Sequence, residues 1–149
     1  MPVLLQMIIR REDLRRNPRV LYVFGDNVMR KGLGGQAAEM RFEPNGVGVA
    51  TKYRPDLSPP AFFREDDRAI ERQKTLIDDD MAPLFEHVKK GGIVVWPTRG
   101  IGTERADLQI KSPTTFDYLQ SKFSALIKVG ELFDKGEFAL TEAMAEKHL

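Results

Sequence analysis

The sequence contains no cysteine among its 149 residues. This absence excludes disulfide bonds, metal sites built on thiolates and cysteine nucleophiles. His87 and His148 also lack acidic partners at the spacing of a metal site, so we expect neither a metal nor another cofactor. A chain without cysteine fits a reducing compartment, and we therefore expect a cytoplasmic protein.

Long apolar runs and a strong net charge are missing as well. No stretch approaches the ~18 uninterrupted apolar residues of a membrane-spanning helix, and the start, MPVLLQMIIRRED, lacks the basic leader of a signal peptide. We therefore expect no membrane partner. The net charge of +1 gives no overall field that would collect polyanions, although local basic pairs such as Arg10-Arg11 and Arg30-Lys31 occur.

The residues that are present suffice for one folded domain. A hydrophobic content of 42% with 30% charged residues is typical of a globular protein, and 149 residues are too few for two ordinary domains. The helical signal weakens beyond Gly130. We therefore predict a domain over residues 1–130 and a C-terminal extension or tail over residues 131–149.

Apolar strands alternate with helices along the chain. The patterns predict strands over 3–9, 20–24, 47–50 and 93–96, and helices over 11–16, 36–41, 64–90 and from Ser112-Pro113 onward. Apolar residues at helical spacing predict the buried faces of the two long helices, which are Ile77, Met81, Leu84, Phe85 and Val88 in the first and Phe116, Leu119, Phe123, Leu126 and Ile127 in the second. Pro83 indicates either a kink in the long helix or a second helix capped by Asp80. Such alternation is typical of an α/β domain, here with a mixed sheet flanked by helices.

A first glycine loop follows the predicted strand over 20–24. Gly25-Asp26-Asn27 predicts a turn, and Gly32-Leu33-Gly34-Gly35 leads into a helix that starts near Gln36. Glycines let a phosphate approach backbone N–H groups, and a following helix adds partial positive charge. The alternative is a tight turn whose glycines serve packing alone.

A second glycine loop, Gly100–Thr103, follows the apolar strand over 93–96. Ligands of α/β proteins usually bind where strands end at their carboxyl side. Two such loops at neighbouring strand ends can hold both sides of a diphosphate, so the pair favours nucleotide binding over packing.

These segments resemble the macrodomain family. Val23–Asn27 followed by Gly32–Ala37 is similar to its strand and first loop, and Pro97–Leu108 is similar to its second loop. Thr51-Lys52 stands where the terminal ADP-ribose glycohydrolase type has a Thr-Lys pair. The resemblance extends over about Leu21 to Leu119 and implies a macrodomain-like α/β fold that binds ADP-ribose or another NAD-derived nucleotide.

The resemblance also implies roles for single residues. Asp26 would be the acid near the adenine, and Lys52 would attack the anomeric carbon of the distal ribose. The ligand-binding residues implied together by the loops and the resemblance are Gly25, Asp26, Asn27, Gly32, Gly34, Gly35, Gln36, Thr51, Gly100, Ile101, Gly102 and Thr103. The alternative for Lys52 is a solvated lysine at a strand end or a simple phosphate contact.

The sequence departs from the resembling enzymes in the second loop. Their aspartate position is occupied by Ala106, so that the candidates for proton transfer are Asp107, one residue late, and Glu104. Loss of a general acid or base removes ~10²–10⁴-fold of rate, which puts hydrolysis in doubt more than binding.

Three functions therefore stay open. The first is binding of ADP-ribose with its removal from a modified protein or nucleobase, and the second is a non-catalytic reader or sequestering protein for an ADP-ribose-containing signal. The third is a nucleic-acid or protein-interaction adaptor that uses the basic pairs. Trp96 is expected in the core, and Asp78-Asp79-Asp80 at a helix flank rather than around a metal.

Overall fold

The computed structural model describes residues 2–134. The elements are β1 (Val3–Gln6), α1 (Arg11–Arg16), β2 (Leu21–Asn27), α2 (Ala37–Met40), β3 (Gly46–Lys52), the 3-10 helix η1 (Pro59–Ala61), α3 (Asp67–Lys89), β4 (Val94–Pro97), α4 (Leu108–Lys111) and α5 (Pro113–Asp134). The predicted alternation of strands and helices is confirmed.

The strands form one sheet in the order β1-β4-β2-β3. The α/β class is confirmed, but the sheet is parallel at every strand pair rather than mixed as expected. The reason is in the connections. Each consecutive pair of strands is joined by a segment that contains a helix. This connection returns the chain to the amino-terminal side of the sheet, so that the next strand runs in the same direction as the previous one.

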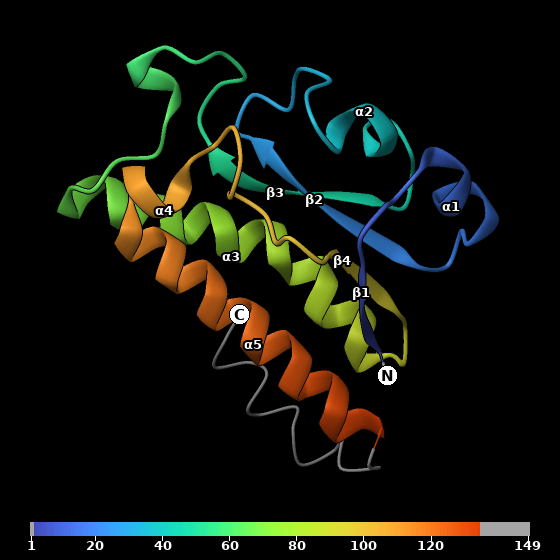
Figure 1. The fold of residues 1–149 in the computed structure, drawn as a ribbon. Helices are drawn as coiled ribbons and strands as arrows, with labels where there is room; N and C mark the ends of the chain where they lie inside the picture. The colour runs from blue at the N-terminus through green and yellow to red at the C-terminus, as the bar shows by residue number, and fades with distance from the viewer. Residues whose placement is uncertain (1, 135–149) are drawn as a thin grey trace.

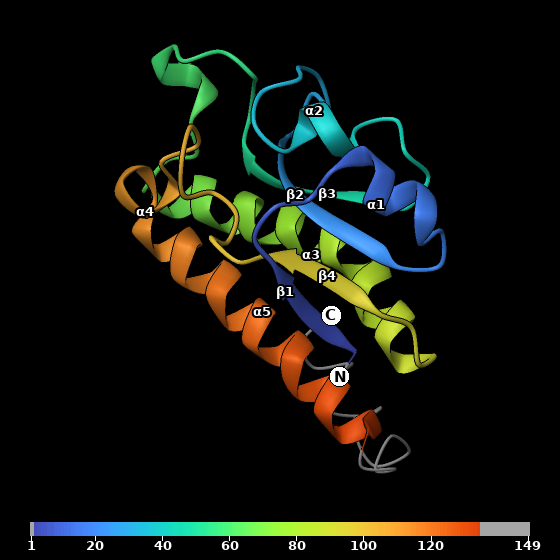
Figure 2. The same cartoon turned by 45° about the vertical axis from the view of Figure 1, so that its right-hand side comes forward.

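Helices cover both faces of the sheet. α3 and α5 lie side by side under one face, whereas α1 and α2 lie over the other (Figures 1 and 2). Alternate strand residues supply the two cores: Val23 faces α3 and α5, and its neighbours Tyr22 and Phe24 face α1 and α2. β4 is covered on both faces, which explains its uninterrupted apolar sequence.

The long helix α3 is a single helix. Its predicted apolar positions, Ile77, Met81, Leu84, Phe85 and Val88, are all buried. The helix continues through Pro83, so a second helix starting there was wrong. A proline removes only one helical N–H, and packing against β3 and α5 holds the remaining turns.

The N-terminal cap of α3 is Asp66, whose carboxylate accepts from the Ala69 N–H at 2.9 Å. Asp80, the alternative cap in the sequence, instead accepts from the Ala50 N–H on β3 at 2.8 Å and from Arg30 at 2.5 Å. The acidic run in α3 therefore fastens the helix to the sheet.

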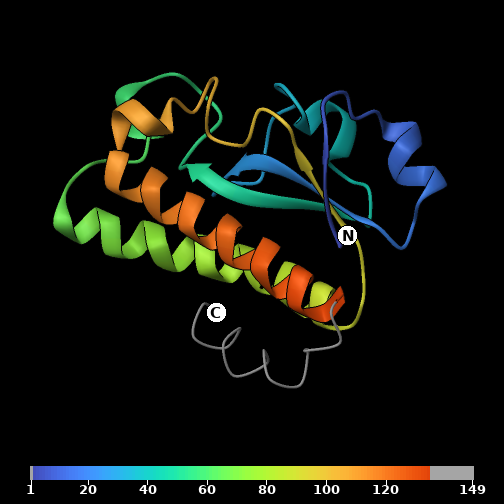
Figure 3. The same ribbon diagram turned by 60° about the horizontal axis from the view of Figure 1, so that its bottom comes forward.

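Helix α5 runs along α3 (Figure 3). The residues expected on its buried face pack into the core, with Leu119 and Leu126 fully enclosed. Trp96 is a core residue, as expected, and stacks on Phe123 at 4.3 Å between ring centroids. The start of α5 is capped by Glu65, which accepts from the Thr114 N–H at 3.1 Å.

The predicted domain boundary at residue 130 lies inside α5, which continues to Asp134. The remaining part of the predicted C-terminal extension, residues 135–149, lies outside the described residues. Within residues 2–134, no helix combines the length and the hydropathy that crossing a bilayer requires.

Two strand ends differ from the prediction. Gly25-Asp26-Asn27 is not a turn but the end of β2, where it pairs with Val49, Ala50 and Lys52 of β3. Local turn preference is overridden here by long-range strand pairing. β1 ends at Gln6 rather than at residue 9, which leaves Met7 and Ile8 in the loop that follows.

Replacement of the core residue Leu84 tests this packing. Leu84→Ala should lower the free energy of unfolding by about 2–5 kcal/mol, because it leaves a cavity beneath the sheet. The matched control is Leu57→Ala, at a side chain that is 68% exposed, for which a change of no more than about 0.5 kcal/mol is expected. Urea denaturation measures both values, and equal losses would contradict the described core.

Candidate functional site

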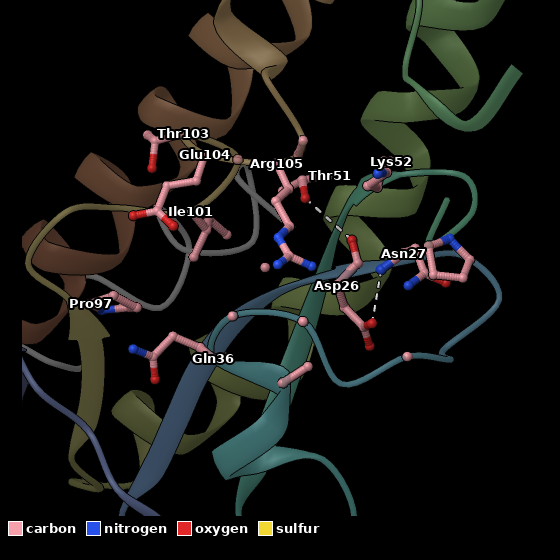
Figure 4. Close-up of a pocket in the computed structure, with 18 of the residues that line it drawn as sticks. Asp26, Asn27, Gln36, Thr51, Lys52, Pro97, Ile101, Thr103, Glu104 and Arg105 are labelled. Carbon is pink, nitrogen blue, oxygen red and sulfur yellow. Dashed lines mark hydrogen bonds between the residues drawn. The ribbon is translucent and has the colours of Figure 1, made fainter. Parts of the chain in front are cut away.

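A cleft of about 650 Å³ opens at the carboxyl ends of the strands. Its walls come from the ends of β2 and β3 and from the loops that follow β1, β2 and β4 (Figure 4). This volume is in the range of sites for small molecules and cofactors. The parallel sheet thus gathers segments from far apart in the sequence around one cleft.

The two glycine loops meet in this cleft. A Cβ built on Gly25 would lie 3.4 Å from the Ile101 Cβ and 3.5 Å from the Gly102 nitrogen, so the second loop lies directly over the end of β2. A Cβ on Gly34 would lie 2.5 Å from the Arg105 Nη1, which places that guanidinium against the first loop.

Both loops carry backbone donors that no protein group uses. Among residues 2–134, the N–H groups of Gly34, Gly35 and Gln36 have no hydrogen-bond acceptor. The same holds for Gly102 and Thr103 in the second loop. Unpaired backbone N–H groups attract anions, and the two loops that carry them line the cleft from two sides.

The helix expected behind the first loop is short. α2 contains only the four residues Ala37–Met40 and begins after Gln36. One turn aligns few peptide dipoles, so it contributes little of the macrodipole that the sequence suggested. An anion at this position would therefore be bound mainly by the N–H groups of the loop itself.

Side chains make the cleft cationic. It is lined by Lys31, Arg41, Lys52, Arg99 and Arg105 on the basic side, against Asp26 and Glu104 on the acidic side. Arg41 is paired with Asp26, and Arg99 lies 3.5 Å from Glu104. Within the described part of the chain, the other three cations have no carboxylate partner.

Asp26 and Arg41 form a buried pair that supports the first loop. The Arg41 guanidinium donates to Asp26 Oδ1 at 2.6 Å and to Oδ2 at 3.2 Å, and its Nε donates to the Gly32 carbonyl at 2.7 Å. Asp26 Oδ1 also accepts from the Asn27 N–H at 2.8 Å. Asp26 therefore anchors the arginine that shapes the glycine loop.

Gly48 of β3 provides the room for this pair. A Cβ at Gly48 would lie 2.5 Å from Asp26 Oδ2 and 2.9 Å from the Asp26 Cβ, closer than real side chains approach. The absence of a side chain on the neighbouring strand thus lets the carboxylate face Arg41.

Lys52 lies at one end of the cleft, at the end of β3 (Figure 4). Its ammonium donates to the Asp56 carbonyl at 2.8 Å and lies 4.7 Å from the centre of the Phe62 ring. Burial lowers the pKa of Lys52 from its usual value, and the charge of Arg105 acts in the same direction, while Asp56 opposes it. At a given pH, more of this amine is neutral than in an exposed lysine.

Most of the residues singled out from the sequence lie in this cleft. The lining includes Gly25, Asp26, Asn27, Gly32, Gly34, Gly35, Gln36, Thr51, Lys52, Gly100, Ile101, Gly102, Thr103 and Glu104. Asp107 is not part of the lining; it adopts a left-handed conformation before α4. Of the two candidates for proton transfer, only Glu104 faces the cleft.

Sequence reasoning missed several residues of the cleft. Arg41 and Arg105 belong to no sequence motif, and the sequence pattern predicts Met7 and Ile8 within a strand. The basic pair Arg30-Lys31 was noted only as a local charge. Contacts with residues distant in the chain determine the positions of these residues, and no local sequence pattern indicates such contacts.

Removal of Arg41 tests the support of the first loop. Arg41→Ala should lower the free energy of unfolding by about 3 kcal/mol, because the buried Asp26 carboxylate loses both hydrogen bonds from Arg41 and keeps only the half-exposed Arg30, at 3.6 Å, as an ionic partner. Arg15→Ala is the control: Arg15 pairs with Glu43, but its side chain is 68% exposed, so a loss of at most about 1 kcal/mol is expected. A small loss in Arg41→Ala would show that the pair does not stabilise the fold.

Comparison with known proteins bears on the family. No curated protein and no solved structure matches the chain. The model of one family, described as Family of unknown function (DUF7831), matches residues 4–122. The matched range includes all of the cleft and the whole sheet apart from Val3, the first residue of β1. The chain therefore belongs to this family of unknown function, DUF7831.

Proposed function

We propose that the cleft binds ADP-ribose or a related NAD-derived nucleotide through its diphosphate. The observation that carries this proposal is the convergence of two glycine loops on one cationic cleft, with backbone N–H groups that have no acceptor among the described residues. A diphosphate carries several anionic oxygens, and donors on two sides can satisfy oxygens of both phosphates.

Arg105 is the side chain best placed to hold the phosphates. Its guanidinium lies against Gly34 while its backbone belongs to the segment after the second loop, so it spans the cleft between the loops. No carboxylate among the described residues neutralises it. A guanidinium can bond two phosphate oxygens at once, which a lysine cannot do with the same geometry.

The macrodomain resemblance supports the same ligand. Its two motifs correspond to the loops on either side of the cleft, and Gln36 and Thr103 line that one cleft. We therefore propose a macrodomain-like protein of the terminal ADP-ribose glycohydrolase type, with an ADP-ribosylated protein or nucleic acid as the partner that carries the ligand.

Calorimetry with ADP-ribose tests binding. Arg105→Ala should weaken the affinity about 10- to 100-fold, the effect of losing hydrogen bonds to a charged group. Arg68→Ala on α3, outside the cleft, should bind as the wild type does. A wild type that does not bind ADP-ribose, or an Arg105→Ala variant with unchanged affinity, would contradict the proposal.

A hydrolytic function is the second proposal, and the buried Lys52 with its lowered pKa favours it. The neutral amine would form a bond to the anomeric carbon of the distal ribose. The bond from that carbon to the modified target would break, and the target would leave with a proton from water, because Glu104 lies on the side of Arg105 away from Lys52 (Figure 4). Water would then hydrolyse the adduct, release ADP-ribose and regenerate the amine.

Reductive trapping tests the nucleophile. Incubation with ADP-ribose and cyanoborohydride should attach one ADP-ribosyl group at Lys52, detected by peptide mass spectrometry, and Lys52→Arg should lose this adduct. Lys31→Arg is the control, because Lys31 lines the cleft but is exposed. The non-catalytic reader would be favoured if the protein binds ADP-ribose tightly, forms no adduct at Lys52 and releases no ADP-ribose from a modified target.

A further inference from the structure

The end of the cleft opposite Lys52 has an apolar wall. Met7 and Ile8 line it with side chains that are 62% and 63% exposed, and Pro97 continues the wall. In Figure 4, Pro97 and Gln36 lie at one end of the site, Lys52 at the other and Arg105 between them. This end of the cleft therefore combines an apolar wall with the paired charges of Arg99 and Glu104, whereas the unpaired cations Arg105 and Lys52 lie toward the other end.

The fold holds this apolar wall in place. Gln6 pairs with Pro97 across β1 and β4, and the Thr98 N–H donates to the Gln6 carbonyl at 3.1 Å. The Gln6 side chain donates to the Ile8 carbonyl at 2.8 Å and to Asp13 at 3.1 Å. Met7 and Ile8 thus lie in a turn held by hydrogen bonds of Gln6, next to the strand end from which the second glycine loop starts.

Gln36 adds a polar group to this end of the cleft. Its Oε1 is buried and has no hydrogen-bond partner among the described residues. A ligand in the cleft cannot reach this enclosed oxygen, whereas the Nε2 of the same amide is not enclosed and has no acceptor among the described residues. The Nε2 can therefore donate to a ring nitrogen at the edge of adenine, such as N7.

We propose that Met7, Ile8, Gln36 and Pro97 form the binding site for the adenine of the nucleotide. An apolar wall suits the faces of a base, and the amide suits its edge. The resemblance implied Asp26 for this role, but both carboxylate oxygens of Asp26 already accept from Arg41. The inference rests on the proposed function, because the diphosphate between the loops sets where the base lies.

Two variants, each measured with ADP-ribose and with inorganic pyrophosphate, test the base site. Ile8→Ser and Gln36→Leu should each weaken ADP-ribose binding about tenfold or more, whereas pyrophosphate affinity should stay within about twofold of the wild type. Leu5→Ser is the matched control, since Leu5 is 59% exposed on β1 but does not line the cleft. Its affinities for both ligands should be unchanged, and thermal melting verifies that all three variants fold.

The outcomes separate the two proposals. If ADP-ribose binds the wild type no more tightly than pyrophosphate, or if Ile8→Ser and Gln36→Leu weaken both ligands equally, the base site is overturned and the diphosphate site stands. If neither ligand binds the wild type, the proposed function itself fails. Loss confined to ADP-ribose in both variants supports the base site.

Discussion

The parallel pairing of β4 with β2 is the interaction on which the candidate site depends. Leu21 and Tyr22 lie opposite Val94 and Val95, and burial on both faces fixes the register of these strands. Because the strands run in the same direction, the loops that follow them leave the sheet at the same edge. Residues about seventy positions apart in the chain thereby form one cleft, without any direct sequence signal that they are neighbours.

A second constraint, the buried pair of Asp26 and Arg41, shapes the first loop within that frame. Away from water an ion pair compensates its loss of hydration only when further hydrogen bonds satisfy it, and here the Gly32 carbonyl and the Asn27 N–H do so. The pair thus joins the end of β2 to the glycine loop and neutralises itself. The positive potential of the cleft is left to the exposed side chains of Lys31 and Arg105 and to the buried ammonium of Lys52, none of which forms an ion pair with a carboxylate among the described residues.

The order of charged and apolar groups along the cleft would determine how a ligand is oriented in it. Under the proposed function, the loops and Arg105 hold the diphosphate, Lys52 stands at the distal ribose and the wall of Met7, Ile8 and Pro97 receives the base. The order follows from the strand order, since β1 and β4 border the end with the apolar wall and β3 carries Lys52. A nucleotide would therefore bind in one direction only.

Local patterns in the sequence determined the α/β class, the buried faces of α3 and α5, the central apolar strand β4 and the two glycine loops, because periodicity and glycine content act over a few residues. Only the tertiary structure decided the all-parallel strand order, the extension of β2 through Asn27, the pairing of Asp26 with Arg41 and the entry of Arg105, Met7 and Ile8 into the cleft. These features depend on contacts between segments remote in sequence, whose free energies arise only when the sheet has assembled.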